Sequence, residues 1–142
     1  MVAYSFKKRF AEPILLGAKA QTIRAPRKRH ARPGEQIQLY TGMRTKHCRL
    51  LARVTCREVV PVRLCFSRHG AAELIRIGDR LMATALLDAF ARQDGFQDIG
   101  DMARFWWAEH PPAEGDTLTF EGVLITWTPI QNLDALAAGR AA

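Results

Sequence analysis

Residues 35–60 alternate apolar and polar side chains on either side of a central turn, and this pattern constrains the fold more than any other part of the chain. Ile37 and Leu39 alternate with polar residues before Gly42, and a second segment of strand character covers residues 48–60. A period of two is that of a strand with one face on a core, and glycine supplies the turn. The sequence therefore predicts a β-hairpin, which requires an antiparallel sheet.

Helical and extended segments flank this hairpin. Residues 6–16 have apolar side chains at helical intervals. Pro13 either kinks this helix or divides it into two short pieces and starts the second. Helices are also predicted over residues 71–91 and from Asp98 onward, and a strand over residues 117–128. Because short alternating strands are interleaved with helices, we predict an α+β fold, a small and mostly antiparallel β-barrel flanked by helices.

The length and composition of the chain are those of one globular domain. It has 142 residues, 48% hydrophobic and 25% charged, which argues against a disordered or fibrous chain. We assign residues 1–130 to the domain and residues 131–142 to an Ala-rich tail that forms a frayed helix. No apolar run approaches the ~20 residues of a membrane-spanning helix, and the first residues lack a signal-peptide stretch. We therefore expect a cytoplasmic protein that does not associate with membranes, and nothing in the sequence indicates an oligomeric state.

The three cysteines are irregularly spaced, which is a poor basis for a disulfide framework, so we expect reduced thiols. Cys48 and Cys56 have the same parity in the predicted strand, and both are expected to pack in the core. A zinc site is the alternative, with four ligands: His47, Cys48, Cys65 and His69. It lacks any paired ligand motif. We therefore expect neither a metal nor a cofactor.

Basic residues are concentrated in the first part of the chain. Residues 1–57 contain 14 Lys or Arg and two acidic residues, a net charge of +12, whereas residues 58–142 carry −5. A solvated basic surface is the simpler explanation of a charge run, but so strong a segregation in a small domain favours a phosphate-rich partner. We therefore expect RNA or a nucleoside or nucleotide to bind this part of the protein.

Residues 17–24, GAKAQTIR, are the strongest candidate for a functional site. Gly17 suits the end of a helix and Thr22 the start of a strand, which would put Lys19 and Thr22 on a tight connection. Arg24 lies two residues after Thr22 and shares its strand face, where a planar guanidinium suits a phosphate or a carboxylate. These side chains outline an anion-binding cleft; the alternative is that they are ordinary surface cations and a strand threonine.

This segment resembles the signature of the ASCH domain, a relative of the RNA-binding PUA domains. Four residues match the family pattern G-x-K-x-x-T-x-R, which follows a short helix: Gly17, Lys19, Thr22 and Arg24. Residues 33–35 (PGE) and 94–96 (DGF) resemble two later family segments, the entry into the barrel and the approach to a helix. The resemblance covers roughly residues 5–128 and implies a PUA-like β-barrel that binds RNA or nucleotides.

Some ASCH proteins are amidohydrolases that remove the acetyl group of N(4)-acetylcytidine, and the resemblance implies that Lys19, Thr22 and a carboxylate act together. Asp94 best matches the carboxylate position, where the family has glutamate; Glu73 and Asp88 are alternatives. A threonine hydroxyl is a poor nucleophile, so a neutral lysine would accept its proton while the carboxylate positions or protonates the amide. Burial or neighbouring cations would have to lower the lysine pKa. Other family members are ribonucleases or non-catalytic RNA-binding modules, and both functions stay open.

Further residues around the cleft are predicted to bind substrate or RNA. The basic loop 25–33 and the turn after Gly42 supply cations for phosphates, and Tyr40 supplies a ring that can stack on a base. The alternatives are solvated charges and an aromatic residue of the core. The predicted binding residues are Arg24, Arg27, Lys28, Arg29, Tyr40, Arg44 and Lys46.

Overall fold

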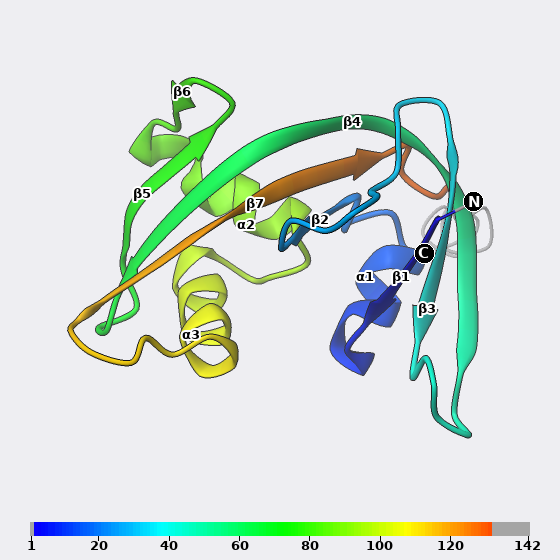
Figure 1. Cartoon of the computed structure of the whole chain (residues 1–142), viewed down its shortest axis with the longest axis horizontal. Helices are drawn as coiled ribbons and strands as arrows, with labels where there is room; N and C mark the ends of the chain where they lie inside the picture. Colours follow the sequence, from blue (N-terminus) through cyan, green and yellow to red (C-terminus); the bar gives the residue numbers. More distant parts are fainter. Residues whose placement is uncertain (1, 132–142) are drawn as a thin grey trace, which may run out of the picture.

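The long strand β4 (Arg49–Ser67) organises the sheet in the computed structural model, which describes residues 2–131 (Figure 1). Its first part pairs with β3 (Gln36–Thr41), and its later part lies between β5 (Ala72–Ile77) and β7 (Thr117–Trp127). Register shifts interrupt all three of these antiparallel pairings. Such bulges bend a strand and increase its twist, so β4 arches over the molecule and serves both parts of the sheet.

Three shorter strands complete a seven-stranded sheet. β1 (Val2–Phe6) runs parallel to β3, β2 (Gln21–Arg24) runs antiparallel to β7, and β6 (Arg80–Leu81) pairs with β5. The α+β fold and the mostly antiparallel sheet are therefore confirmed. The predicted closure into a barrel is wrong for residues 2–131, because no pairing there joins the end strands β1 and β6 or links β1 to β2.

Three α-helices and two 3₁₀ helices accompany the sheet, and α1 and α3 lie on the concave side of the β4 arch (Figure 1). In chain order they are η1 (Lys8–Phe10), α1 (Ala11–Leu15), η2 (Thr84–Leu86), α2 (Leu87–Gln93) and α3 (Ile99–Glu109). The Asp98 side chain accepts a hydrogen bond of 2.8 Å from the backbone N–H of Asp101 and so caps the start of α3. Met102 and Trp106 of α3 are buried, so this helix covers the core of the arch.

Several predicted elements are confirmed and two are wrong in part. The β3–β4 hairpin, the strand at β7 and the helix from Asp98 all form. Residues 2–6, however, form β1, in which alternate residues are buried, and the helical stretch begins only after Phe6. Residues 71–91 are helical only in their second half, because residues 72–77 pair with β4. Pairing with an apolar neighbouring strand outweighed the local helical pattern. The predicted frayed helix of the tail lies almost wholly outside the described residues.

The cysteines differ in their environments. Cys56 is buried, but Cys48 precedes β4 and is exposed, so its predicted place in the core is wrong. Cys65 is half-buried on β4. Residues 2–131 contain no group of three or more His, Cys, Asp or Glu that could hold a metal ion, so the alternative zinc site is not assembled there. None of the described helices is long and apolar enough to cross a membrane.

Candidate functional site

The connection between α1 and β2 turns Lys19 into the interior. The backbone N–H groups of Gly17 and Lys19 donate to the carbonyls of Ile14 and Pro13, at 3.1 and 2.9 Å, and so cap the end of α1. Gly17 has a φ of +82°, and a Cβ there would collide with the carbonyl oxygen of Ile130. Only glycine fits this turn without strain, which explains why α1 ends at Leu15, four residues before Lys19.

Asp94 reaches the same place from the end of α2. It follows the last residue of that helix, and Gly95 after it has a φ of +96°. A Cβ on Gly95 would lie 2.8 Å from Cδ of Lys19 and 2.8 Å from Cδ1 of Phe10. The absence of a side chain at Gly95 therefore lets the lysine stem and the phenylalanine ring pack directly against this turn.

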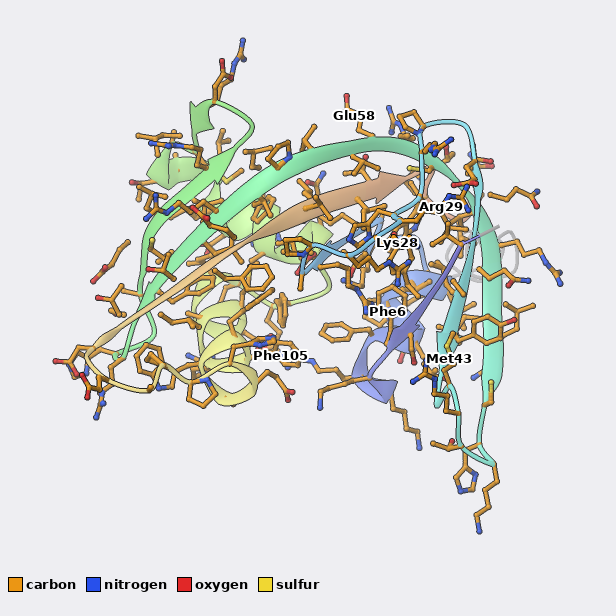
Figure 2. The ribbon with its side chains drawn as sticks, in the orientation of Figure 1. Phe6, Lys28, Arg29, Met43, Glu58 and Phe105 are labelled. Atoms are coloured by element: carbon orange, nitrogen blue, oxygen red, sulfur yellow. The ribbon has the colours of Figure 1, made fainter. Side chains whose placement is uncertain are left out.

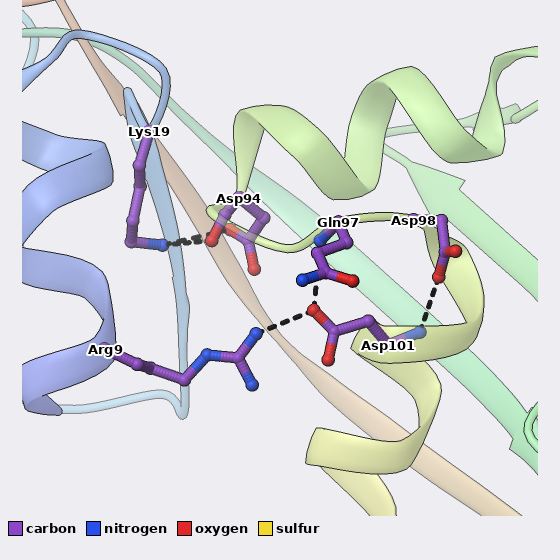
Figure 3. Close-up of polar contacts among 6 residues, drawn as sticks. All are labelled: Arg9, Lys19, Asp94, Gln97, Asp98 and Asp101. Carbon is purple, nitrogen blue, oxygen red and sulfur yellow. Dashed lines mark hydrogen bonds and ion pairs between the residues drawn. The ribbon is translucent and has the colours of Figure 1, made fainter.

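Lys19 contacts Asp94 (Figure 3) and two aromatic rings. Its side chain is 3% exposed, and Nζ donates a 2.6 Å hydrogen bond to the backbone carbonyl of Asp94. The distance from Nζ to the carboxylate Oδ1 is 3.6 Å, and Gln21 Nε2 donates to the same oxygen at 3.3 Å. Nζ also lies 4.8 Å from the ring centre of Phe10 and 5.4 Å from that of Phe6.

Burial shifts both ionisable groups of this pair toward their neutral forms. Desolvation lowers the pKa of Lys19 from 10.5 to about 8, with the Asp94 charge opposing the shift and the Arg24 charge adding to it. Burial likewise raises the pKa of the Asp94 carboxyl, against the opposing effect of the Lys19 ammonium. A lysine with a pKa of about 8 is neutral in about a tenth of molecules at pH 7, far more often than an exposed lysine.

Thr22 and Arg24 lie side by side on β2, as the spacing predicted. Thr22 is 5% exposed, and its Oγ1 accepts a 2.9 Å hydrogen bond from Nε of Arg24. Arg24 also donates through Nη2 to the carbonyl of Ser5 at 2.7 Å, and its guanidinium lies 4.8 Å from the ring centre of Phe6. A cationic donor on Oγ1 stabilises negative charge on that oxygen and leaves the hydroxyl proton free for another acceptor.

A cavity of 280 Å³ joins these side chains. Its lining includes four polar side chains, those of Lys19, Thr22, Arg24 and Asp94. Aromatic rings also line it, among them Trp106, whose ring centre lies 4.9 Å from that of His110 and 4.7 Å from that of Phe120. Apolar walls with a few convergent polar groups are usual in small-molecule sites, and this cavity has the size of a nucleobase or a similar planar ring.

The cavity also has charged residues at its edge. Lys7 and Glu109 both line it and form an ion pair of 2.9 Å between the end of β1 and the end of α3. Arg9, which does not line the cavity, pairs with Asp101 at 2.6 Å (Figure 3). Its guanidinium lies 5.0 Å from the ring centre of Phe96. These two ion pairs connect the N-terminal segment to α3 across the site.

The structure brings four of the predicted site residues together and places the others elsewhere. The four that line the cavity are Lys19, Thr22, Arg24 and Asp94. Tyr40 alternates with the buried Leu39 and Thr41, so its side chain lies on the opposite face of β3 and not at the cavity. Arg44 and Lys46 are exposed on the β3–β4 turn. The alternative carboxylates, Glu73 and Asp88, are exposed and do not line the cavity.

The basic loop lies next to the site, partly held by its own contacts. The guanidinium of Arg27 lies 4.6 Å from the ring centre of Tyr4, and its Nε donates to the carbonyl of Arg29. Arg29 forms an ion pair with Glu35, and Lys28 is exposed (Figure 2). The loop thus presents Arg27 and Lys28 to solvent, while the charge of Arg29 is largely paired.

Tyr4 and His30 anchor this loop to β1. Nε2 of His30 lies 2.9 Å from the carbonyl of Ala25, which can only accept, so Nε2 carries the proton. Nδ1 of His30 then accepts from the Tyr4 hydroxyl at 2.9 Å, and the same hydroxyl accepts from the Ala31 N–H at 3.2 Å. Burial lowers the pKa of His30 in agreement with this neutral form.

Several residues of the site were not predicted. Gln21 stands inside the motif but was not assigned a role, although its amide bonds the Asp94 carboxylate. The aromatic wall was also missed, because its members come from separate elements and have no common spacing: Phe6, Phe10, Phe105, Trp106 and Phe120. Only the fold brings them together. The position of Gln21 between Lys19 and Thr22 in the sequence could have identified it as a residue of the site.

Comparison of the chain with protein-family models, with curated proteins and with solved structures found no match. The interpretation of the site therefore depends on its own geometry.

Proposed function

We propose that the cavity binds a nucleoside-sized substrate and hydrolyses an amide on its base, as in N(4)-acetylcytidine, and that the chain is an ASCH-type, PUA-like protein. The observation that carries this proposal is Lys19, a buried lysine whose pKa is lowered to about 8 in a cavity that it shares with a buried threonine. Perturbed, buried ionisable groups in a cavity are typical of catalytic sites. The family motif of residues 17–24 supports the same assignment.

The proposed reaction begins when the Thr22 hydroxyl attacks the carbonyl carbon of the amide. A C–O bond forms, the π electrons move to the carbonyl oxygen, and the neutral amine of Lys19 accepts the hydroxyl proton. The hydrogen bond from Arg24 Nε to Oγ1, 2.9 Å long, stabilises negative charge on the threonine oxygen as its proton leaves. The tetrahedral intermediate then collapses, the C–N bond breaks, and Lys19 returns the proton to the leaving amino group.

Water completes the cycle by hydrolysing the acetyl ester on Thr22. Lys19 is again neutral at this point and accepts the proton of the attacking water. The ester C–O bond breaks and the Thr22 oxygen takes up the proton from Lys19. The product leaves as acetic acid, which ionises to acetate in water. Asp94 acts mainly as a positioning group, since its backbone carbonyl holds Nζ at 2.6 Å while the carboxylate lies 3.6 Å away.

The shape of the cavity supports a planar substrate. The aromatic rings that line it can stack on a base, while its polar side chains meet a group projecting from that base. With a volume of 280 Å³ the cavity has room for a nucleobase with a small substituent.

Turnover of N(4)-acetylcytidine, followed as release of cytidine and acetate, tests the proposal. We expect activity in the wild type, and a loss of about a hundredfold or more in both Lys19→Met and Thr22→Val. Thr55→Val is the matched control, because Thr55 is an exposed strand threonine on β4. Activity that survives in both site variants would contradict the assigned roles.

Binding of RNA without turnover is the second candidate, and the exposed cations Arg27 and Lys28 beside the cavity favour it. A binding module should hold single-stranded RNA with an affinity that falls steeply with salt, because phosphate contacts release counterions. Fluorescence anisotropy with labelled RNA measures this. Salt-sensitive binding without any release of cytidine or acetate would favour this candidate.

A further inference from the structure

A second and larger hollow adjoins the cavity. It has a volume of 1320 Å³ and lies between α1 and the turn that connects β3 to β4. The two hollows share Ser5, Phe6 and Lys7. Phe6 lies between Phe105 of the cavity and Met43 of this turn (Figure 2). A ligand that fills the cavity can therefore extend past β1 into this hollow, which we call the hairpin groove.

The floor of the hairpin groove is a row of side chains across three strands. Phe6 of β1 is paired with Thr41 of β3, and Thr41 is paired with Arg49 of β4. Side chains at paired positions point to the same face of a sheet, so these three lie in line. The row leads from the aromatic edge of the cavity to the guanidinium of Arg49.

The walls of the hairpin groove combine apolar surface with positive charge. α1 contributes Ala11 and Leu15, and Leu16 beside them is 48% exposed, one of the few large apolar side chains left open to solvent in residues 2–131. Met43 faces them from the turn. The charged residues that line the hairpin groove are Lys7, Lys8, Arg49 and a single acid, Glu12.

The turn that forms the far wall is held in one conformation. Gly42 has a φ of +64°, and a Cβ there would lie 2.8 Å from the carbonyl oxygen of His47. The Thr45 hydroxyl donates to the Gly42 carbonyl at 2.6 Å and accepts from the His47 N–H at 3.1 Å. The turn also carries Arg44 and Lys46, which are exposed cations that do not line the hairpin groove.

We propose that the hairpin groove binds the nucleotides that adjoin the residue held in the cavity, so that the preferred substrate is a single-stranded polynucleotide. This inference rests on the proposed function, because it extends the same site. Exposed apolar side chains next to cations suit bases and phosphates in alternation. A single strand is required, because a base within a duplex cannot enter a cavity without leaving the stack. The cations face one acid, which favours a polyanion over a neutral peptide.

The test compares two substrates and two double variants. The substrates are free N(4)-acetylcytidine and a short single-stranded RNA with one N(4)-acetylcytidine at its centre. Lys8→Glu with Arg49→Glu reverses two charges of the hairpin groove, and neither residue lines the cavity. Arg76→Glu with Arg80→Glu is the matched control, because it makes the same change of charge at exposed positions on β5 and β6, the other end of the sheet (Figure 1).

We expect the hairpin-groove variant to raise the KM for the oligonucleotide about tenfold or more, and the control variant about twofold or less. The slope of log affinity against log salt should fall by roughly 0.7 for each lost phosphate contact. The free nucleoside should show no such difference between the two variants. Equal effects of both double variants on the oligonucleotide would overturn the inference, as would a wild type that hydrolyses the oligonucleotide no better than the nucleoside.

Binding separates this inference from the proposed function. If neither substrate is hydrolysed, the proposed amidase function fails, and anisotropy with labelled unmodified RNA decides on the hairpin groove. A tenfold or larger loss of affinity confined to the hairpin-groove variant would support it, and equal affinities would overturn it. Polyglutamate is the competitor for a different occupant: if it displaces RNA at equal charge concentration, the hairpin groove binds acidic chains in general and the inference is wrong.

Discussion

The lysine inside the cavity and the cations of the basic loop differ in burial, and this difference separates their roles. Lys19 is 3% exposed and is held by hydrogen bonds and rings, whereas Arg27 and Lys28 of the basic loop are exposed. Burial of a charge costs free energy and shifts its pKa, while an exposed charge stays hydrated and is screened by salt. The buried lysine is therefore suited to proton transfer, and the loop to long-range attraction of phosphates.

Mutation of Lys19 and mutation of the basic loop should differ most in their effect on turnover. Lys19→Met keeps the length and the burial of the side chain but removes the base, so release of cytidine should fall about a hundredfold or more. Arg32→Met removes a cation from the exposed loop and should change turnover about twofold at most. Circular dichroism of both variants checks that the fold is intact. Equal losses in the two variants would show that net charge, and not the buried amine, matters.

The second difference is in the stability cost of filling a glycine position. Gly95 and Gly34 both have left-handed φ values, +96° and +86°, but a Cβ at Gly95 meets Lys19 and Phe10 at 2.8 Å while Gly34 has nothing within 4 Å. Gly34→Ala should cost about 1 kcal/mol from the backbone alone, and Gly95→Ala about 2 kcal/mol or more. Urea unfolding measures both. Equal costs would mean that residues 94–96 are loosely packed.

The pH dependence of stability gives a third comparison. The pKa of Lys19 is about 8 in the folded protein and 10.5 as its ordinary value, so between these values the unfolded chain binds more protons. Stability should therefore rise as pH increases from about 8 to 10.5, by on the order of 3 kcal/mol at most. Lys19→Met should lack this rise, which the difference between the two urea titration series would show. If the free energy of unfolding depended on pH in the same way in both proteins, folding would not lower the pKa of Lys19.

The smallest expected effect is that of the exposed loop on RNA affinity. Arg27→Gln and Lys28→Gln should each weaken binding only a few-fold at moderate salt and lower the slope of log affinity against log salt by roughly 0.7. Anisotropy at several salt concentrations measures both quantities. An unchanged slope in both variants would remove the loop from the RNA-binding surface.

The sequence predicted the local parts of the site better than its assembly. Lys19, Thr22 and Arg24 lie within one short segment, so turn and strand rules were sufficient to bring them together. Asp94 was placed only through a family resemblance, because 75 residues separate it from Lys19. The fold was predicted in the same uneven way. The β3–β4 hairpin follows from local alternation, whereas β5 was missed because its partner β4 decides its conformation.

The most direct test of the account is the titration of the Lys19 amine. NMR of the protein with ¹³C-labelled lysine Cε atoms, assigned by comparison with Lys19→Met, follows this group as the pH is raised. We expect a pKa of about 8, which makes Lys19 a base close to neutral pH. A pKa near the ordinary value of 10.5 would show that the amine is not desolvated, and would contradict its role as the base.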